Sequence, residues 1–149
     1  PCHVSNRRRQ HWDSADAAHA HFGAKAAFAR WDRRVLADYI DTGLEPDPAG
    51  GVRLAFSREI ETSFYNTLPH HFDRVLKRHP PRCPVAFVGG TQSLENRQVG
   101  LALTQFLAGD RMQMIEGSHL FPMERPDETA RAVLDAAARM NLTPLEMAA

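Results

Sequence analysis

Two short apolar runs, each followed by an amphipathic stretch, constrain the fold of this 149-residue chain more than any other feature. Pro84–Val88, with Gly89 and Gly90 after it, is apolar on both faces, as a central parallel strand is. A second strand is predicted over Asp110–Glu116. Between them, Gly109 ends a helix whose apolar residues recur at helical spacing: Val99, Ala102, Leu103, Phe106 and Leu107. The order strand, helix, strand, helix predicts a βαβα unit with parallel strands.

His119 lies in the loop that follows the second predicted strand. Gly117 breaks the apolar run, and Pro126 suits the first turn of a final helix, where Asp127 and Glu128 favour the helix dipole. The apolar residues of this helix repeat along one face: Ala130, Val133, Leu134 and Ala137. Catalytic side chains are commonly mounted on loops that a rigid scaffold holds, so His119 is the first candidate for a catalytic residue.

The part of the chain before residue 80 reads as mainly helical. Ser14 is a predicted cap for a helix from Ala15 to about Phe28, and Asp32 caps a second helix that Gly43 ends. Residues 44–51 form a turn-rich loop, and residues 52–56 form a short extended piece. Two more helices are expected, one capped by Ser57 and closed by Pro69, the other over residues 72–76.

Composition excludes several classes of protein. Eighteen basic and eighteen acidic residues cancel, so no bulk charge favours nucleic acid or an anionic membrane. No apolar run approaches the ~20 residues of a membrane span. Two cysteines, Cys2 and Cys83, make no disulfide framework and favour a reduced, cytoplasmic setting, with Cys83 as a packing residue. The histidines lack the spacing of metal ligands, and we expect neither a metal nor another cofactor.

The run Gly117-Ser-His119-Leu-Phe-Pro, followed by Glu124-Arg-Pro126 and an amphipathic helix, resembles the C-terminal end of the α/β-hydrolase family. The runs Trp31-Asp, Tyr39-Ile-x-x-Gly43-Leu and Gly50-Gly-Val-Arg-Leu are similar to its small-molecule hydrolase branch. The resemblance implies an α/β fold: residues 1–79 as part of a helical cap, and residues 80–149 as the last two strands and helices of the core sheet. It thus covers only the C-terminal portion of such a domain.

The resemblance implies a nucleophile, an acid and a histidine base, in that order along the chain. His119 comes last, as expected, but the chain contains no Gly-x-Ser-x-Gly nucleophile elbow. In many members the acid stands three residues after the glycine that ends the penultimate strand, and here that position is Ser93. Glu95 is the nearest carboxylate on the same loop, although its place in the first turn of a helix also suits a role beside the helix dipole. Other members of the family carry the acid after an earlier strand, and that alternative stays open.

The expected function is therefore that of the C-terminal portion of a hydrolase that acts on a small, apolar, ester-like substrate. His119 would be the general base, with Leu120 and Phe121 on the pocket floor and Phe64 and Tyr65 contributed by the cap. This portion alone is expected to be inactive, and its oligomeric state is left open. The alternatives are a non-catalytic hydrolase-like protein that binds a ligand or partner, and the same fold with an Asp or Cys nucleophile.

Overall fold

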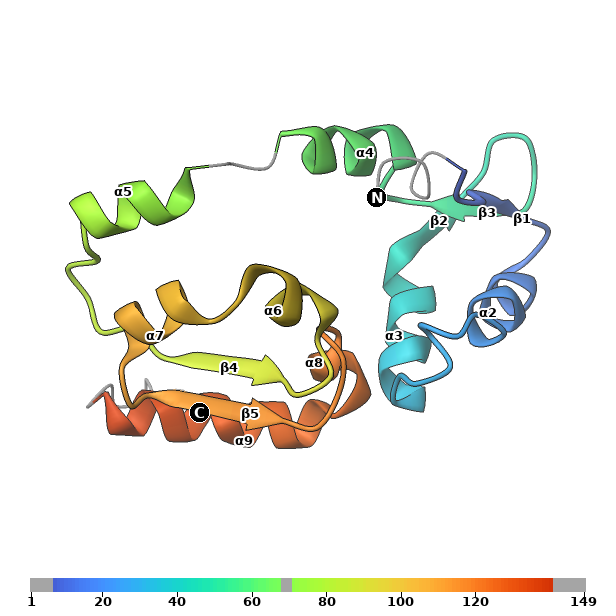
Figure 1. The fold of residues 1–149 in the computed structure, drawn as a ribbon. Coiled ribbons are helices and arrows are strands. Elements are labelled where there is room, and N and C mark those ends of the chain that lie inside the picture. Colours follow the sequence, from blue (N-terminus) through green and yellow to red (C-terminus); the bar gives the residue numbers. More distant parts are fainter. Residues whose placement is uncertain (1–6, 68–70, 141–149) are drawn as a thin grey trace, which may run out of the picture. The chain divides into compact units, whose positions relative to one another are not determined.

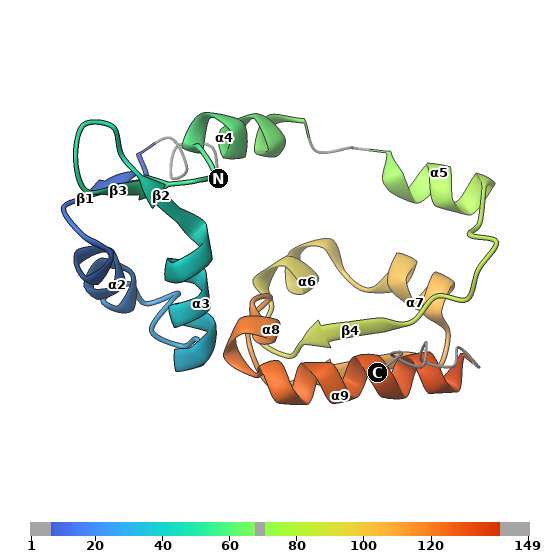
Figure 2. The same ribbon diagram turned by 180° about the vertical axis from the view of Figure 1, so that it is seen from behind.

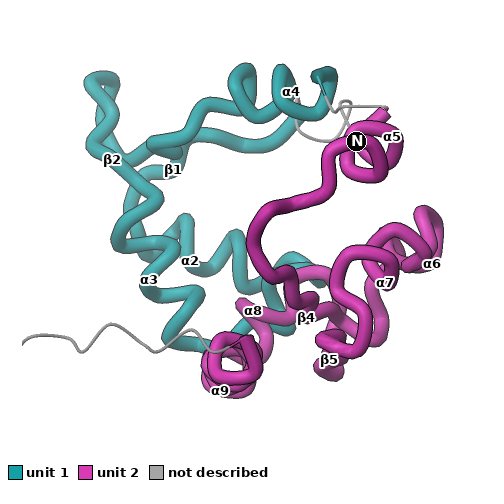
Figure 3. The backbone as a smooth tube through the Cα atoms, turned by 90° about the vertical axis from the view of Figure 1, so that its left-hand side faces the viewer, with its two compact units in different colours: residues 1–70 teal, residues 71–149 magenta. Residues whose placement is uncertain are grey.

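The computed structural model describes residues 7–67 and 71–140, which belong to two compact units, residues 1–70 and 71–149 (Figure 3). The break between the units falls before the helix Phe72–Arg78, whereas the predicted division between cap and core falls after it. The assignment of the first unit as a cap stays a prediction.

The first unit contains three helices and a small antiparallel sheet among its described residues (Figure 1). In chain order its elements are β1 (His11–Trp12), α2 (Ala15–Gly23), α3 (Arg33–Gly43), β2 (Leu44–Pro46), β3 (Val52–Leu54) and α4 (Arg58–Asn66). The strand order is β1-β3-β2, with His11 opposite Arg53 and Glu45 also opposite Arg53. The short extended piece predicted after residue 51 is thus the central strand of a sheet.

Three predicted helix caps are confirmed. The Ser14 hydroxyl accepts a hydrogen bond from the Ala17 N–H at 3.1 Å, and the Asp32 carboxylate accepts one from the Arg34 N–H at 2.8 Å. The Ser57 hydroxyl accepts from the Ile60 N–H at 3.3 Å. Each cap satisfies a backbone donor that the first turn of a helix leaves open.

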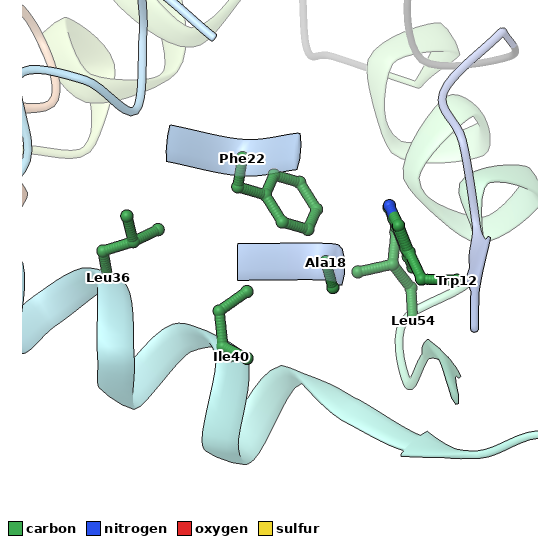
Figure 4. Packing of buried hydrophobic residues seen from close by; sticks show 6 residues of the cluster. All are labelled: Trp12, Ala18, Phe22, Leu36, Ile40 and Leu54. Atoms are coloured by element: carbon green, nitrogen blue, oxygen red, sulfur yellow. The ribbon is translucent and has the colours of Figure 1, made fainter. Parts of the chain in front are cut away.

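The core of the first unit brings together side chains from β1, α2, α3 and β3 (Figure 4). It consists of the buried residues Trp12, Ala18, Phe22, Leu36, Ile40 and Leu54. The Phe22 ring lies 5.2 Å from that of Trp12 and 4.8 Å from that of Phe28, so the end of α2 is fixed by aromatic packing.

For two segments of the first unit, the predicted boundaries of the secondary structure are wrong. The helix that begins at Ala15 ends at Gly23 and not near Phe28, because the chain turns there and Phe28 folds back onto the core. The predicted loop over residues 44–51 begins with β2, which pairs with β3 as an edge strand that tolerates Pro46. Pro69, the predicted helix stop, lies outside the described residues.

The second unit contains a pair of parallel strands with helices around it (Figures 1 and 2). Its elements are α5 (Phe72–Arg78), β4 (Phe87–Gly90), α6 (Leu94–Val99), α7 (Ala102–Ala108), β5 (Met112–Ile115), α8 (Phe121–Glu124) and α9 (Pro126–Arg139). Phe87 lies opposite Met112, and Gly90 lies opposite Ile115. The prediction of a βαβα unit with parallel strands is confirmed.

The details of this unit differ from the pattern of apolar residues. β4 begins at Phe87 and not at Pro84, since proline offers no N–H to a strand ladder, and Cys83 is exposed and not a packing residue. The helix between the strands is interrupted at Gly100, whose φ is 77°.

The last helix, α9, packs against both strands, but with another face than the spacing predicts. It buries Ala132 and Ala136, whereas Val133 and Leu134 are exposed. Ile115, Phe121 and Ala132 form the core of this unit, with Val88 packed against them. Among the described residues, no helix combines the length and the apolar character needed to cross a membrane.

Candidate functional site

The loops that follow β4 and β5 are joined by backbone hydrogen bonds beyond the strands. Because the strands are parallel, their carboxyl ends lie at the same edge of the pair. The Thr91 N–H donates to the Ile115 carbonyl at 2.9 Å, and the Gln92 N–H donates to the Gly117 carbonyl at 2.8 Å. The two loops therefore hold a fixed position relative to each other, which is a suitable base for a site.

These loops bring Glu95 and His119 together. The His119 Nδ1 lies 3.1 Å from the Glu95 Oε2, within ion-pair distance, and both side chains are about half exposed. The contact uses Nδ1 and leaves Nε2 of the imidazole for another partner. Both residues were candidates from the sequence, and their roles in catalysis stay predictions.

Glu95 is held in its ionised form by several donors. Its own backbone N–H, the Ser93 hydroxyl and the charge of His119 together keep the pKa of the Glu95 carboxyl below its usual value, against the opposing effect of burial. The Ser93 hydroxyl donates to the Glu95 Oε2 at 3.0 Å and accepts from the Asn96 N–H at 3.2 Å. The Glu95 Oε2 thus meets both Ser93 and His119.

Ser93 therefore donates a hydrogen bond to the carboxylate of Glu95 and does not itself take the place of an acid. Its side chain is buried, with 2% of the residue exposed, and it caps α6. The resemblance to the α/β-hydrolase family places Ser93 where an acid is often found. The signal for its actual role is the spacing Ser-x-Glu at a helix start, where a capping hydroxyl and a first-turn carboxylate meet.

The His119 loop passes unusually close to the end of β4. A Cβ atom on Gly90 would lie 2.0 Å from the Ser118 carbonyl oxygen, so only glycine allows this approach. Gly117 has a φ of 151°, and a Cβ there would lie 2.8 Å from the Glu124 carboxylate. Glu124 in turn accepts hydrogen bonds from Ser118.

The four predicted pocket residues belong to two different units. Leu120 is half-buried beside His119, and Phe121 is a core residue packed with Ile115 and Ala132. Phe64 and Tyr65 lie on α4 of the first unit and are exposed. Their role in a substrate pocket stays a prediction.

An open pocket of about 270 Å³ lies in the first unit, and neither Glu95 nor His119 contributes to it. Its lining is mostly polar: Gln10, His11, Glu45, Arg53, Leu54, Ala55, Ser57 and Glu59. Across residues 7–67 and 71–140, no cluster of three or more His, Cys, Asp or Glu side chains is arranged to hold a metal ion.

Comparison with known proteins defines the class of fold. No protein-family model matches the chain, and no curated protein matches it. Solved structures do: this chain has the fold of part of an α/β-hydrolase, as the resemblance in the sequence predicts.

Three such structures are similar to the chain. The hydrolase of E-2-(acetamidomethylene)succinate matches with a TM-score of 0.72 and 19% identity, over 87% of this chain and 47% of that one. The peroxisomal α/β-hydrolase Lpx1 of Saccharomyces cerevisiae matches with a TM-score of 0.69 and 18% identity, over 99% of this chain and 42% of that one. The thioesterase domain from the curacin biosynthetic pathway has a TM-score of 0.56 and 18% identity, over 89% of this chain and 46% of that one. The chain spans less than half the length of each.

Proposed function

We propose that this chain supplies the acid and the base of an α/β-hydrolase, with His119 as general base and Glu95 as the carboxylate that supports it. The observation that carries the proposal is the contact of 3.1 Å between His119 Nδ1 and Glu95 Oε2. It lies just beyond the carboxyl ends of two parallel strands, where open α/β sheets bind their ligands.

The orientation of the imidazole suits general-base catalysis. With Nδ1 directed at Glu95, Nε2 would take a proton from a serine hydroxyl as its oxygen attacks the substrate carbonyl, and would return it to the leaving alcohol. Water would then release the acyl group by the same proton transfers. Glu95, whose pKa is lowered, is ionised at neutral pH as carboxyls ordinarily are, and it would stabilise the positive charge that develops on His119.

The nucleophile of this reaction belongs to a polypeptide segment other than these 149 residues, since they hold no Gly-x-Ser-x-Gly elbow. We propose a small, apolar ester as substrate. The names of two similar structures, E-2-(acetamidomethylene)succinate hydrolase and a thioesterase domain, support hydrolysis as the reaction class.

The test starts from the coding DNA that precedes the Pro1 codon. If an in-frame apolar strand with a Gly-x-Ser-x-Gly elbow precedes it, the whole reading frame is expressed and assayed with p-nitrophenyl butyrate. His119→Gln is expected to lower kcat by roughly 10²–10⁴-fold, the usual contribution of a general base. His79→Gln, an exposed histidine of the same unit, is the matched control and should retain full activity. Equal activity of His119→Gln and the control would overturn the proposal.

Ser93, which stands where many α/β-hydrolases have their acid, favours a second candidate, a hydrolase-like protein that binds a ligand or partner without turnover. The same DNA separates the two. A start codon directly before the Pro1 codon would refute catalysis by this chain and leave the binding role.

A further inference from the structure

Glu124 holds the backbone on both sides of His119 through a single neighbour, Ser118. The Ser118 N–H donates to the Glu124 Oε2 at 3.1 Å, and the Ser118 hydroxyl donates to the Glu124 Oε1 at 2.6 Å. The same hydroxyl accepts from the Leu120 N–H at 3.0 Å. One carboxylate thus fixes the residue before His119 directly and the residue after it through a hydroxyl.

The turn around Ser118 lies with its other side against the end of β4. The Ser118 carbonyl lies against Gly90, in the space that any side chain would fill, and the Gly117 carbonyl accepts from the Gln92 N–H at 2.8 Å. The turn is therefore held between a strand end and a carboxylate. Hydrogen bonds to a carboxylate are shorter and stronger than those between neutral groups, so the Glu124 side is the stronger of the two.

We propose that Glu124 is a positioning residue, which acts through Ser118 to place the His119 imidazole against Glu95. Its importance for catalysis rests on the proposed function, whereas its effect on geometry does not. Without Glu124, the N–H and the hydroxyl of Ser118 each lose their acceptor. The hydroxyl can then rotate, so its hydrogen bond from the Leu120 N–H is no longer held in place. The backbone at residue 119 then gains freedom, and the His119 side chain leaves Glu95 for water.

A purely structural role is the competing explanation. Glu124 is the last residue of α8 and stands just before α9, where a negative charge stabilises a helix. That role predicts a loss of stability with an unchanged site in the molecules that remain folded. The positioning role predicts a changed site in folded molecules, so a local readout at Glu95 separates the two.

The experiment measures the Glu95 carboxyl by NMR titration in this chain. The pKa of Glu95 is lowered first by its own backbone N–H and in smaller part by the charge of His119. His119→Gln therefore raises it and defines the full effect. Glu124→Ala is expected to produce at least half of that rise, and the double variant should add nothing to His119→Gln alone. Glu124→Gln, which keeps one acceptor oxygen, should restore part of the effect.

Arg125→Gln is the matched control. Arg125 adjoins Glu124 and also braces this loop, but it donates from Nε to the Glu116 carbonyl at 3.1 Å, upstream of the turn. It should leave the Glu95 titration unchanged. Ser118→Ala removes only the hydroxyl bonds and serves if Glu124→Ala does not fold, with a smaller rise of the Glu95 pKa expected.

An unchanged Glu95 titration in folded Glu124→Ala, or an equal change in Arg125→Gln, would overturn the inference. Neither result depends on turnover. A failure of the proposed function appears separately, as full activity of His119→Gln in the expressed reading frame. The two ideas therefore fail independently.

Discussion

Replacing Gly90 with alanine tests whether the close approach of the two loops builds the site. The added Cβ would lie 2.0 Å from the Ser118 carbonyl oxygen and 2.6 Å from that of Gly117. Both contacts are with backbone, which has no rotamer to change, so the His119 loop must retreat by more than 1 Å. Overpacking of this kind costs about 1–3 kcal/mol.

The retreat also breaks a hydrogen bond. The Gln92 N–H donates to the Gly117 carbonyl at 2.8 Å, and a shift of more than 1 Å takes this pair beyond bonding distance. A lost hydrogen bond adds about 1 kcal/mol, so we expect Gly90→Ala to lower the free energy of unfolding by about 2–4 kcal/mol in all. Urea unfolding followed by circular dichroism measures this difference.

Gly89→Ala is the matched control, one residue away in the same strand. Its Cβ would meet side-chain atoms, the Phe87 ring at 2.5 Å and the Asn96 amide at 3.2 Å, and these can rotate away. Its cost should stay near that of a displaced rotamer, about 0.5–1.5 kcal/mol. Nuclear Overhauser contacts between Glu95 and His119 should vanish in Gly90→Ala and persist in the control. Equal stability of the two variants, with those contacts intact, would refute the reasoning.

Three further outcomes are expected. A backbone N–H and the His11 imidazole lower the pKa of the Asp47 carboxyl, so the stability that Asp47 contributes is present above pH ~4 and is lost as the pH falls through the folded value. Asp47→Asn should therefore flatten the acid limb of a stability-against-pH curve, and an unaltered limb would contradict this. Phe22→Ala, in the buried core, should cost about 3–5 kcal/mol in urea unfolding, whereas Phe64→Ala, with 63% of the residue exposed, should cost little. Leu134→Glu should lower the binding of an apolar dye such as ANS without loss of stability, because Leu134 is exposed on α9, and an unchanged dye signal would count against it.

Features with a local cause could be predicted from the sequence. The caps at Ser14, Asp32 and Ser57 are confirmed, because each depends on a side chain that reaches a backbone N–H within three residues. The parallel pair could also be predicted, since two apolar runs separated by a helix permit few other topologies.

The buried face of α9 could not be predicted from residue size. The spacing points to Val133 and Leu134, the largest apolar side chains, but the helix buries Ala132 and Ala136 against the strands. Small side chains let a helix axis lie close to a sheet, and that advantage depends on the surface opposite. The sequence pattern of one helix gives no information about the surface that the helix packs against.

The position of Glu95 shows the same limit at the candidate site. Its place in the first turn of α6 favours a role beside the helix dipole, and the structure confirms that place. The contact with His119 depends on the hydrogen bonds between the loops after β4 and β5, which join residues more than twenty positions apart. Sequence spacing within one loop carries no information about such a contact.

The hydrogen bonds between these two loops have a consequence for how such a protein changes over evolutionary time. The hydrogen bonds and the ion pair described around Glu95 and His119 join residues of 87–125, a single contiguous segment. A contiguous segment of this kind can be inherited, duplicated or fused to other sequences as one piece, with its carboxylate and imidazole already next to each other. Residues elsewhere in the chain make none of these polar contacts, and substitutions there reach the pair through packing, as at Ala132, which packs with Phe121.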